Sequence, residues 1–369
     1  MFDHLNIFIS LAVSFTIVYF VIPKIIKVSR KIKLFDVPNH RSAATQVVPT
    51  LGGIAIFAGF IISTIISSNS FNIDELKYML VGTIAMFLIG LKDDIIGLSA
   101  KKKFIFQMIM VLYLVMLGGY RINNLHGLFG INEMGYLMGV IVTVIAMVGI
   151  INAVNLVDGI DGLAGGIGLL ISLVYGFWFL NVGDFIYALT CFSLAGSLIA
   201  FLLYNVFGHT NKIFMGDTGS LILGTVIAGL TIHFNVYSPT LAGTVHGLPA
   251  LSLAIIIVPV IDTLRVFAIR LSHKRSPFSP DMNHIHHNLL KLTGSHLISS
   301  SIIIAVTGLV ILFAFLVIDQ IGNNGLFILL LFSGFILASI PAFILKWQSL
   351  NKPIEEEVKE NKMRQKRLI

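Results

Sequence analysis

The chain of 369 residues is 56% hydrophobic and only 12% charged, with a mean hydropathy of +0.92. Soluble globular proteins carry roughly 25% charged residues, so this composition excludes a soluble domain and indicates a polytopic α-helical membrane protein. The net charge of +7 is no argument for nucleic-acid binding, because basic residues in a membrane protein follow its topology. The single cysteine, Cys191, lies in an apolar run and cannot form an intrachain disulfide.

Apolar runs of roughly 17–24 residues recur along the chain, and each is long enough to cross the hydrocarbon core of a bilayer. They predict about eleven transmembrane helices, at 5–26, 50–68, 77–91, 104–119, 136–153, 164–180, 185–207, 219–237, 247–270, 298–318 and 325–346. No small-residue cleavage site follows the first run, so it is not a cleaved signal peptide. We expect one transmembrane catalytic domain at 1–346, because no polar linker divides it, and a charged cytoplasmic tail at 347–369.

The distribution of basic residues predicts the orientation. With the N-terminus outside and the C-terminus in the cytoplasm, only Lys77 and Arg121 of the 25 Lys and Arg residues fall at the outer side. The positive-inside rule therefore supports this topology. It does not explain the acidic residues, which play little part in topology and yet gather on the same side. Several carboxylates on one face would repel one another unless a divalent cation or basic residues neutralise them.

The segment Asn152–Gly166 is the most informative of these polar stretches. Asn155, Asp158 and Asp161 are spaced three residues apart, so they would share one face if the segment were helical. Carboxylates at the edge of an apolar span are costly and usually functional. A polar turn between two helices is the alternative, but that would need only one Asp-Gly pair.

Two further cytoplasmic loops carry similar chemistry. In loop 92–103, Asp93 and Asp94 are suited to hold Mg²⁺ or act as a base, and Lys101–Lys103 offer charges for phosphate, although juxtamembrane lysines often only anchor topology. In a helix the two neighbouring carboxylates diverge, so one would face the site while the other binds backbone or a lysine. In loop 212–224, Asp217 precedes an apolar span, as either a helix cap or a Mg²⁺ ligand beside a phosphate-binding helix N-terminus.

The remaining candidates lie in loops 36–53 and 271–297. The first carries Arg41 and a glycine pair that opens the second span, and the second carries His284, His286 and His287. Zinc is one option for the histidines, but no cysteine or His-Glu-x-x-His pattern accompanies them. Nearby arginines and lysines better fit binding of a diphosphate or a sugar hydroxyl. Together the loops indicate Mg²⁺-dependent chemistry on a phosphorylated substrate at the inner leaflet.

These motifs resemble the polyprenyl-phosphate N-acetylhexosamine-1-phosphate transferase family, also called glycosyltransferase family 4. The resemblance rests on five ordered motifs that span nearly the whole chain: Pro49–Gly53, Asp93-Asp94 with Lys103 and Gln107, Asn155–Gly162, Phe214–Ser220 and His284–His287. Ile285 interrupts the histidines, and Gln46-Val47-Val48 stands where the peptidoglycan branch carries a lysine. Both departures resemble the undecaprenyl-phosphate N-acetylglucosamine-1-phosphate transferase branch.

The resemblance implies an enzyme that joins UDP-N-acetylhexosamine, with N-acetylglucosamine as the favoured sugar, to undecaprenyl phosphate. UMP would leave, and the lipid product would start a cell-surface glycan such as O-antigen lipopolysaccharide or a cell-wall polymer. The implied location is the bacterial cytoplasmic (inner) membrane, with the active site facing the cytoplasm. The partners are the two substrates and the bilayer, without nucleic acid, and the chain is either a monomer or a homodimer.

The resemblance also implies roles for single residues. Asp217 would ligate Mg²⁺, with Mn²⁺ as an alternative and Asp94 as a second ligand. Asp93 or Asp94 would position or deprotonate the lipid phosphate, and Asn155, Asp158 and Asp161 would hold nucleotide or metal. Lys103, Arg41, His284, His286 and His287 would bind substrate.

Two other functions remain as alternatives. Lipid I synthesis from a UDP-muramoyl-pentapeptide is the nearer one. A cation-coupled transporter would carry its ionisable groups near mid-span, whereas nearly all acids here lie at cytoplasmic span ends.

Overall fold

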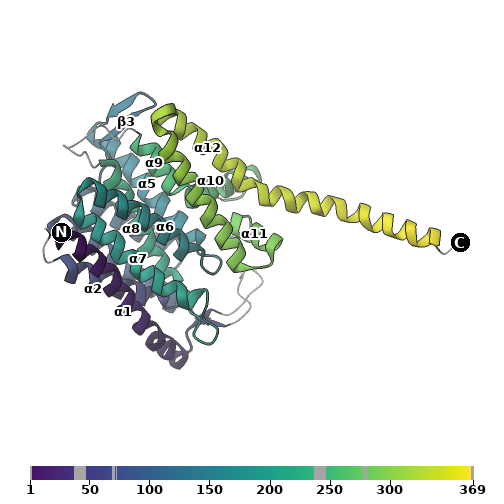
Figure 1. Cartoon of the computed structure of the whole chain (residues 1–369), viewed down its shortest axis with the longest axis horizontal. Helices are drawn as coiled ribbons and strands as arrows, with labels where there is room; N and C mark the ends of the chain where they lie inside the picture. The colour runs from purple at the N-terminus through teal and green to yellow at the C-terminus, as the bar shows by residue number, and fades with distance from the viewer. Residues whose placement is uncertain are drawn as a thin grey trace.

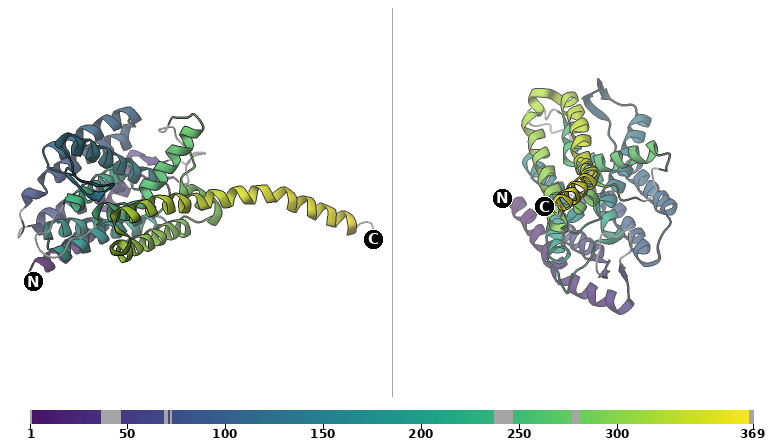
Figure 2. Two further views of the ribbon diagram at one scale, coloured as in Figure 1. Left: turned by 90° about the horizontal axis from the view of Figure 1, so that it is seen from above. Right: turned by 90° about the vertical axis from the view of Figure 1, so that its right-hand side faces the viewer.

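The computed structural model describes residues 2–36, 47–68, 71, 73–236, 247–276 and 281–366. Helices form a bundle, and the last helix leaves it and projects away with the C-terminus at its tip (Figure 1). The left view of Figure 2 shows the same end of the helix extending beyond the bundle. The described chain is therefore a mostly helical membrane protein with one continuous bundle.

The described helices and strands alternate with short connections. In chain order they are α1 (Phe2–Ile32), β1 (Phe35–Asp36), β2 (Val48–Pro49), α2 (Gly52–Ser67), the 3-10 helix η2 (Ile73–Glu75), α3 (Lys77–Ile96), α4 (Ala100–Met116), β3 (Asn124–Leu128), β4 (Ile131–Glu133), α5 (Tyr136–Val157), α6 (Leu163–Val182), α7 (Phe185–Asn205), α8 (Gly216–Val236), α9 (Leu248–Ile255), α10 (Ile257–Ser272), α11 (Ile285–Thr293) and α12 (His296–Lys366). The predicted spans fall on helices, with a break within the one at 247–270. The prediction of an all-α chain omits two short antiparallel strand pairs, β1–β2 and β3–β4.

Fewer helices than predicted qualify as membrane spans. Within the described residues, six helices are long and apolar enough to cross a membrane, or seven if the bent pair α9 and α10 counts as one span. Helices α2 and α4 are shorter, at 16 and 17 residues. Helix α12 contains both of the last two predicted spans, separated by a kink at Gly322. The number of about eleven spans therefore stays a prediction.

The prediction of one continuous helix at 247–270 is wrong. Helix α9 ends at Ile255, and α10 departs from it at an angle of 79°. Pro259 lies in the first turn of α10 and has no N–H to donate to the carbonyl of Ile255, so an unbroken helix would lose that hydrogen bond and clash with the ring. The bend directs α10 toward α11 and the histidine segment.

Helix α8 lies at the centre of the bundle, and 89% of its most apolar stretch is buried. It packs against α2, α3 and α5 among others. The start of α2 is hydrogen-bonded to the segment just before α8. The backbone N–H groups of Gly52 and Gly53 donate to the carbonyls of Phe214 and Met215, at 2.9 Å each. A Cβ on Gly53 would lie only 2.6 Å from Gly219 Cα and still closer to its nitrogen. The glycine pair at 52–53 therefore allows α2 to touch α8.

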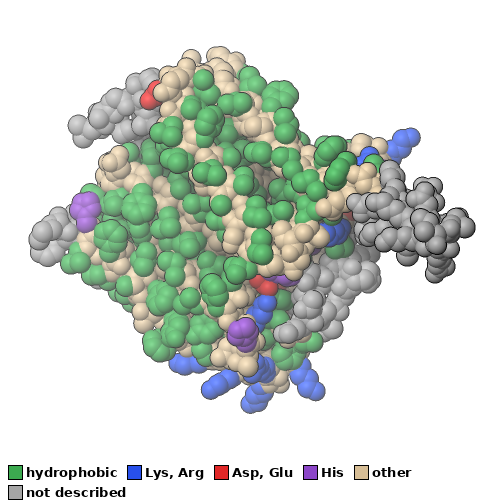
Figure 3. Space-filling view, turned by 45° about the vertical axis from the view of Figure 1, so that its right-hand side comes forward, with side chains coloured by type: hydrophobic (Ala, Val, Ile, Leu, Met, Phe, Trp, Pro, Cys, Tyr) green, Lys and Arg blue, Asp and Glu red, His purple; other side chains and the backbone are tan. Residues whose placement is uncertain are grey.

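Basic residues gather at one end of the bundle. Figure 3 shows Lys and Arg side chains along one edge of a face that is otherwise mostly apolar. Exposed members at the end of α1 are Lys24, Lys27, Arg30, Lys31 and Lys33. The guanidinium of Arg30 donates to the carbonyl of Thr210, in the loop that leads into α8. The basic end of α1 and the N-terminus of α8 are therefore at the same end of the molecule.

Candidate active site

Asp94, near the end of α3, caps the N-terminus of α8. Its Oδ1 accepts from the backbone N–H of Asp217 at 2.8 Å, and its Oδ2 accepts from the N–H of Thr218 at 3.0 Å and the Thr218 hydroxyl at 2.5 Å. The first turn of a helix has unpaired N–H groups, which a carboxylate satisfies. Burial raises the pKa of Asp94 to about 6, against the lowering effect of these hydrogen bonds. The sequence analysis gave Asp217 as a possible cap, but the cap comes from another helix.

Asp93 points to the other side of the same turn. Its Oδ2 forms an ion pair with Lys103 Nζ, and its Oδ1 accepts from the N–H of Leu98 at 2.6 Å. Lys103 Nζ also lies 2.8 Å from Asp217 Oδ1. Burial alone would lower the pKa of Lys103, but Asp217 and Asp93 raise it overall. The sequence predicted that one of the two carboxylates binds either backbone or a lysine. Asp93 binds both.

Asn155, in the last turn of α5, brings a second helix to the same carboxylate. Its Nδ2 donates to Asp217 Oδ1 at 2.8 Å and lies 2.7 Å from Ser220 Oγ. Asp217 is therefore held by an amide and an ammonium on one oxygen, and its side chain is still 35% exposed. An exposed carboxylate whose orientation is fixed by neighbours is available to bind a cation.

Asp158 follows directly after α5. The residue is exposed, yet neighbouring protein desolvates its carboxyl group. This surrounding protein, together with the negative charges of Asp217, Asp94 and Asp161, raises the pKa of Asp158 to about 7. The local field is thus negative and favours a bound cation.

Asp161 has partners of its own. Its Oδ2 lies 2.6 Å from Lys212 Nζ and 3.1 Å from His296 Nδ1. Burial would raise the pKa of Asp161, but hydrogen bonds from His296 and Lys212 outweigh it and lower the pKa below the usual value. Asn155, Asp158 and Asp161 do not share a helical face, because the condition of a continuous helix is not met: α5 ends at Val157.

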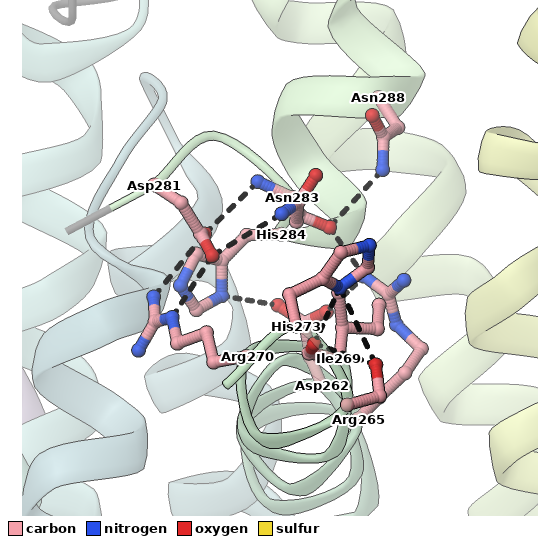
Figure 4. Close-up of polar contacts among 10 residues, drawn as sticks. Asp262, Arg265, Ile269, Arg270, His273, Asp281, Asn283, His284 and Asn288 are labelled. Carbon is pink, nitrogen blue, oxygen red and sulfur yellow. Dashed lines mark hydrogen bonds and ion pairs between the residues drawn. The ribbon is translucent and has the colours of Figure 1, made fainter. Parts of the chain in front are cut away.

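The histidine segment is built on a second carboxylate-capped helix. Asp262 of α10 accepts from the N–H of Ile285 at 3.0 Å, and thus caps α11, while its Oδ2 lies 2.9 Å from His284 Nδ1 (Figure 4). Arg265 donates to Asp262 at 2.9 Å and to the carbonyl of Asn283. A second ion pair, between Arg270 and Asp281, closes the turn before α11 in the same view.

His286 is the least expected member of this segment. It is 1% exposed, and among the described residues neither ring nitrogen has a hydrogen-bond partner. Its ring centroid lies 5.6 Å from that of His284 and 4.2 Å from that of the partly exposed His287. Burial, and then the charge of His287, lowers the pKa of His286 to about 3, so the ring is neutral. A buried polar group without a partner costs about 1–3 kcal/mol, which calls for an explanation.

The structure thus brings together most of the residues expected from the sequence. Asp93, Asp94, Lys103, Asn155 and Asp217 form one connected network, with Asp158 electrostatically coupled to it. Asp161 and the histidines lie in adjoining clusters, and Arg41 is outside the described residues. The described residues contain no group of three or more His, Cys, Asp or Glu side chains placed to enclose a metal ion.

No pattern in the sequence pointed to two of the contributing residues. Lys212 and His296 both bind Asp161, but they lie 51 and 135 residues away from it in the chain. Only a contact in three dimensions identifies them.

The chain matches the family model described as glycosyl transferase family 4 over residues 76–235. It is 31% identical to the undecaprenyl-phosphate alpha-N-acetylglucosaminyl 1-phosphate transferase of Salmonella typhi, over 72% of this chain and 71% of that protein. The chain belongs to glycosyl transferase family 4. Another family member, the probable undecaprenyl-phosphate N-acetylglucosaminyl 1-phosphate transferase of Bacillus subtilis (strain 168), is 30% identical over 81% of each chain. The protein of the same activity from Escherichia coli (strain K12) is 30% identical over 72% of this chain and 71% of its own.

The residues that match the family model include most of the candidate site. It contains the Asp93-Asp94, Asn155–Asp161 and Asp217 motifs, whereas the histidine segment lies beyond it. The connected network described above is therefore made from the part of the chain that the family model recognises.

Proposed function

We propose that this protein transfers N-acetylglucosamine 1-phosphate from UDP-N-acetylglucosamine to undecaprenyl phosphate and releases UMP. The observation that carries the proposal is the convergence of Asp94, Asn155 and Asp158 on Asp217 in a family 4 chain. The sugar and the lipid are those named for relatives that align with this chain over more than two thirds of both chains. They also favour this reaction over lipid I synthesis.

In this reaction an oxygen of the lipid phosphate forms a bond to the β-phosphorus of the nucleotide sugar. The bond between that phosphorus and the bridging oxygen breaks, and UMP leaves with the bridging oxygen and its negative charge. Phosphoryl transfer of this kind depends on alignment and charge neutralisation more than on covalent help from protein. The lipid phosphate and the two phosphates of the nucleotide sugar are all anionic, so a cation is expected at the site.

The donor set fits Mg²⁺, which binds through one or two carboxylates and otherwise through water and substrate phosphates. Asp217, partly exposed and held in place by Lys103 and Asn155, is the ligand we propose, with Asp158 facing the same negative region. Bound there, Mg²⁺ would neutralise the diphosphate and stabilise the departing UMP. The donor set does not distinguish Mg²⁺ from Mn²⁺.

The protein groups around this carboxylate orient it. Both oxygens of Asp94 already accept hydrogen bonds from α8, so we assign it to fixing the helix that carries Asp217 rather than to binding metal. Lys103 bridges Asp93 and Asp217 and lies beside the region where substrate phosphates would bind. Asp161 is engaged by Lys212 and His296, which supports a role in holding its loop.

We also propose that the site faces the cytoplasm from a bacterial inner membrane. The support is the basic end of α1, which contacts the loop before α8, together with the positive-inside rule. Undecaprenyl phosphate would then enter from the inner leaflet and the nucleotide sugar from the cytoplasm.

The test uses the purified full-length protein with undecaprenyl phosphate and Mg²⁺ in detergent. UDP-N-acetylglucosamine, UDP-N-acetylgalactosamine and UDP-muramoyl-pentapeptide are supplied separately, and UMP and the lipid product are measured. We expect turnover with UDP-N-acetylglucosamine and none without the lipid. Turnover with the muramoyl-pentapeptide alone would favour lipid I synthesis, and no UMP from any of the three would overturn the proposal.

A further inference from the structure

The buried imidazole of His286 packs directly against Gly159, the residue after Asp158. A Cβ placed on Gly159 would lie 2.9 Å from His286 Cδ2, 3.1 Å from Cε1, and closer still to Nε2. All three of its nearest atoms belong to this one ring. The contact joins the histidine segment to the loop that carries the exposed carboxylate.

Glycine at 159 is required by this contact and not by the backbone. Gly159 is absent from the described glycines with positive φ, so an alanine would adopt its conformation without strain. The matched case is Gly149 in α5, which also has no positive φ and would place a Cβ with nothing within 4 Å. The imidazole supplies the nearest obstruction to a side chain at 159.

The rest of the loop is anchored on its other side. Asp161 is bound by Lys212 and His296, and the N–H of Gly162 donates to Asn205 Oδ1 at 2.7 Å. These contacts fix the loop from 161 onward. The preceding peptide is held by backbone hydrogen bonds from Asp158 to Asn155 and from Gly159 to Val157, and the ring of His286 packs against it. Asp158 is the loop carboxylate left exposed toward Asp217.

We propose that His286 is a positioning residue, which holds the Asp158–Gly159 peptide so that the Asp158 carboxylate faces the site at Asp217. The proposal rests on the proposed function, because it assigns Asp158 a part in that reaction. A direct contact between His286 and a substrate would require the ring to leave a position in which it is 1% exposed. The packing of the ring against Gly159 is thus its contribution to the reaction.

The first test enlarges the side chain at 159 and shortens the one at 286. Gly159→Ala, His286→Ala and the double variant are compared with Gly149→Ala as the control, by UMP release and thermal midpoint in detergent. We expect Gly159→Ala to lower kcat by about 100-fold, since a displacement near 1 Å at a reacting group has that effect. The double variant should recover about 10-fold over Gly159→Ala, because removing the ring makes room for the added methyl. A double variant no more active than Gly159→Ala would overturn the contact.

The second test asks whether His286 acts through Asp158. In the wild-type background, His286→Ala should lower kcat about 10-fold while KM for undecaprenyl phosphate and the thermal midpoint stay unchanged. In an Asp158→Asn background it should lower kcat no further. Independent, multiplying effects, or a loss that follows only the thermal midpoint, would overturn the positioning role.

These outcomes are distinct from failure of the proposed function. If the wild-type protein releases no UMP from any of the nucleotide sugars, the proposed function fails and the positioning role fails with it. If the wild type is active and the two effects multiply, only the role of His286 is wrong.

Discussion

Asp94 accepts hydrogen bonds from both the backbone nitrogen and the hydroxyl of Thr218, although the two residues are 124 positions apart in the chain. This contact makes the end of α3 the N-terminal cap of α8. A cap normally comes from the residue before the helix, so here the helix start is defined by tertiary structure. Because Asp217 lies in that first turn, the cap also sets the position of the proposed cation ligand.

Asp94→Asn should weaken this cap. The amide has one acceptor oxygen, and its NH₂ group would face a backbone donor. Loss of a cap costs about 0.5–2 kcal/mol, so we expect the thermal midpoint to fall by a few degrees and turnover to fall at least about 10-fold. Thermal unfolding and UMP release measure both effects. Thr218→Val, which removes only the hydroxyl, is the control with the smaller loss, and an unchanged thermal midpoint in Asp94→Asn would contradict the cap.

Removal of the cation should stop the reaction. We expect EDTA to abolish UMP release and added Mg²⁺ to restore it. Asp217→Asn should lower kcat by about 100-fold or more and raise the Mg²⁺ concentration needed for half-maximal rate, because a neutral amide neither attracts nor holds the cation well. Asn155→Ala should have a smaller effect, since Lys103 still orients Asp217. Full turnover in Asp217→Asn would show that it is not the ligand.

The ion pair of Asp161 with Lys212 should behave as a structural unit. Asp161→Asn and Lys212→Met should each lower the thermal midpoint, and the double variant should lower it no more than either one, because they break the same contact. The pKa of Asp161 is lowered in the folded protein, so its charge contributes stability above about pH 4, the usual value, and that contribution is lost as the pH falls through the folded pKa. The difference between wild type and Asp161→Asn should therefore be full at pH 7 and shrink below about pH 4. A difference that grows on acidification would refute the assignment.

Cysteine labelling in whole cells should report the orientation. The native Cys191 is buried, so the wild-type protein should stay unlabelled by a membrane-impermeant maleimide. We expect Lys102→Cys to react only in permeabilised cells and Asn132→Cys, in the exposed strand β4, to react in intact ones. The physical reason is that the lysine-rich side of a span stays in the cytoplasm. The reverse pattern would invert the topology and place the candidate site outside.

The sequence alone determined the membrane character, the helical positions and most of the candidate site. Apolar runs of sufficient length form helices in a membrane, because hydrocarbon offers no hydrogen-bond partner for the backbone N–H and C=O groups. Polar residues at the ends of such runs are expensive, so Asp93, Asp94, Asn155, Asp158 and Asp217 were visible without a structure. The free-energy cost of a polar residue beside an apolar span depends on the neighbouring sequence alone. The positions of these residues along the chain therefore indicate the chemistry of the site.

Tertiary structure decided which of these residues bind one another. Nothing in the local sequence shows that Asp94 caps α8, that Lys212 and His296 take up Asp161, or that the ring of His286 lies against Gly159. The break at Ile256 likewise turned a predicted single span into two helices. Ion pairs and close packing depend on distances between segments far apart in the chain, and residue spacing along one segment carries no record of those distances.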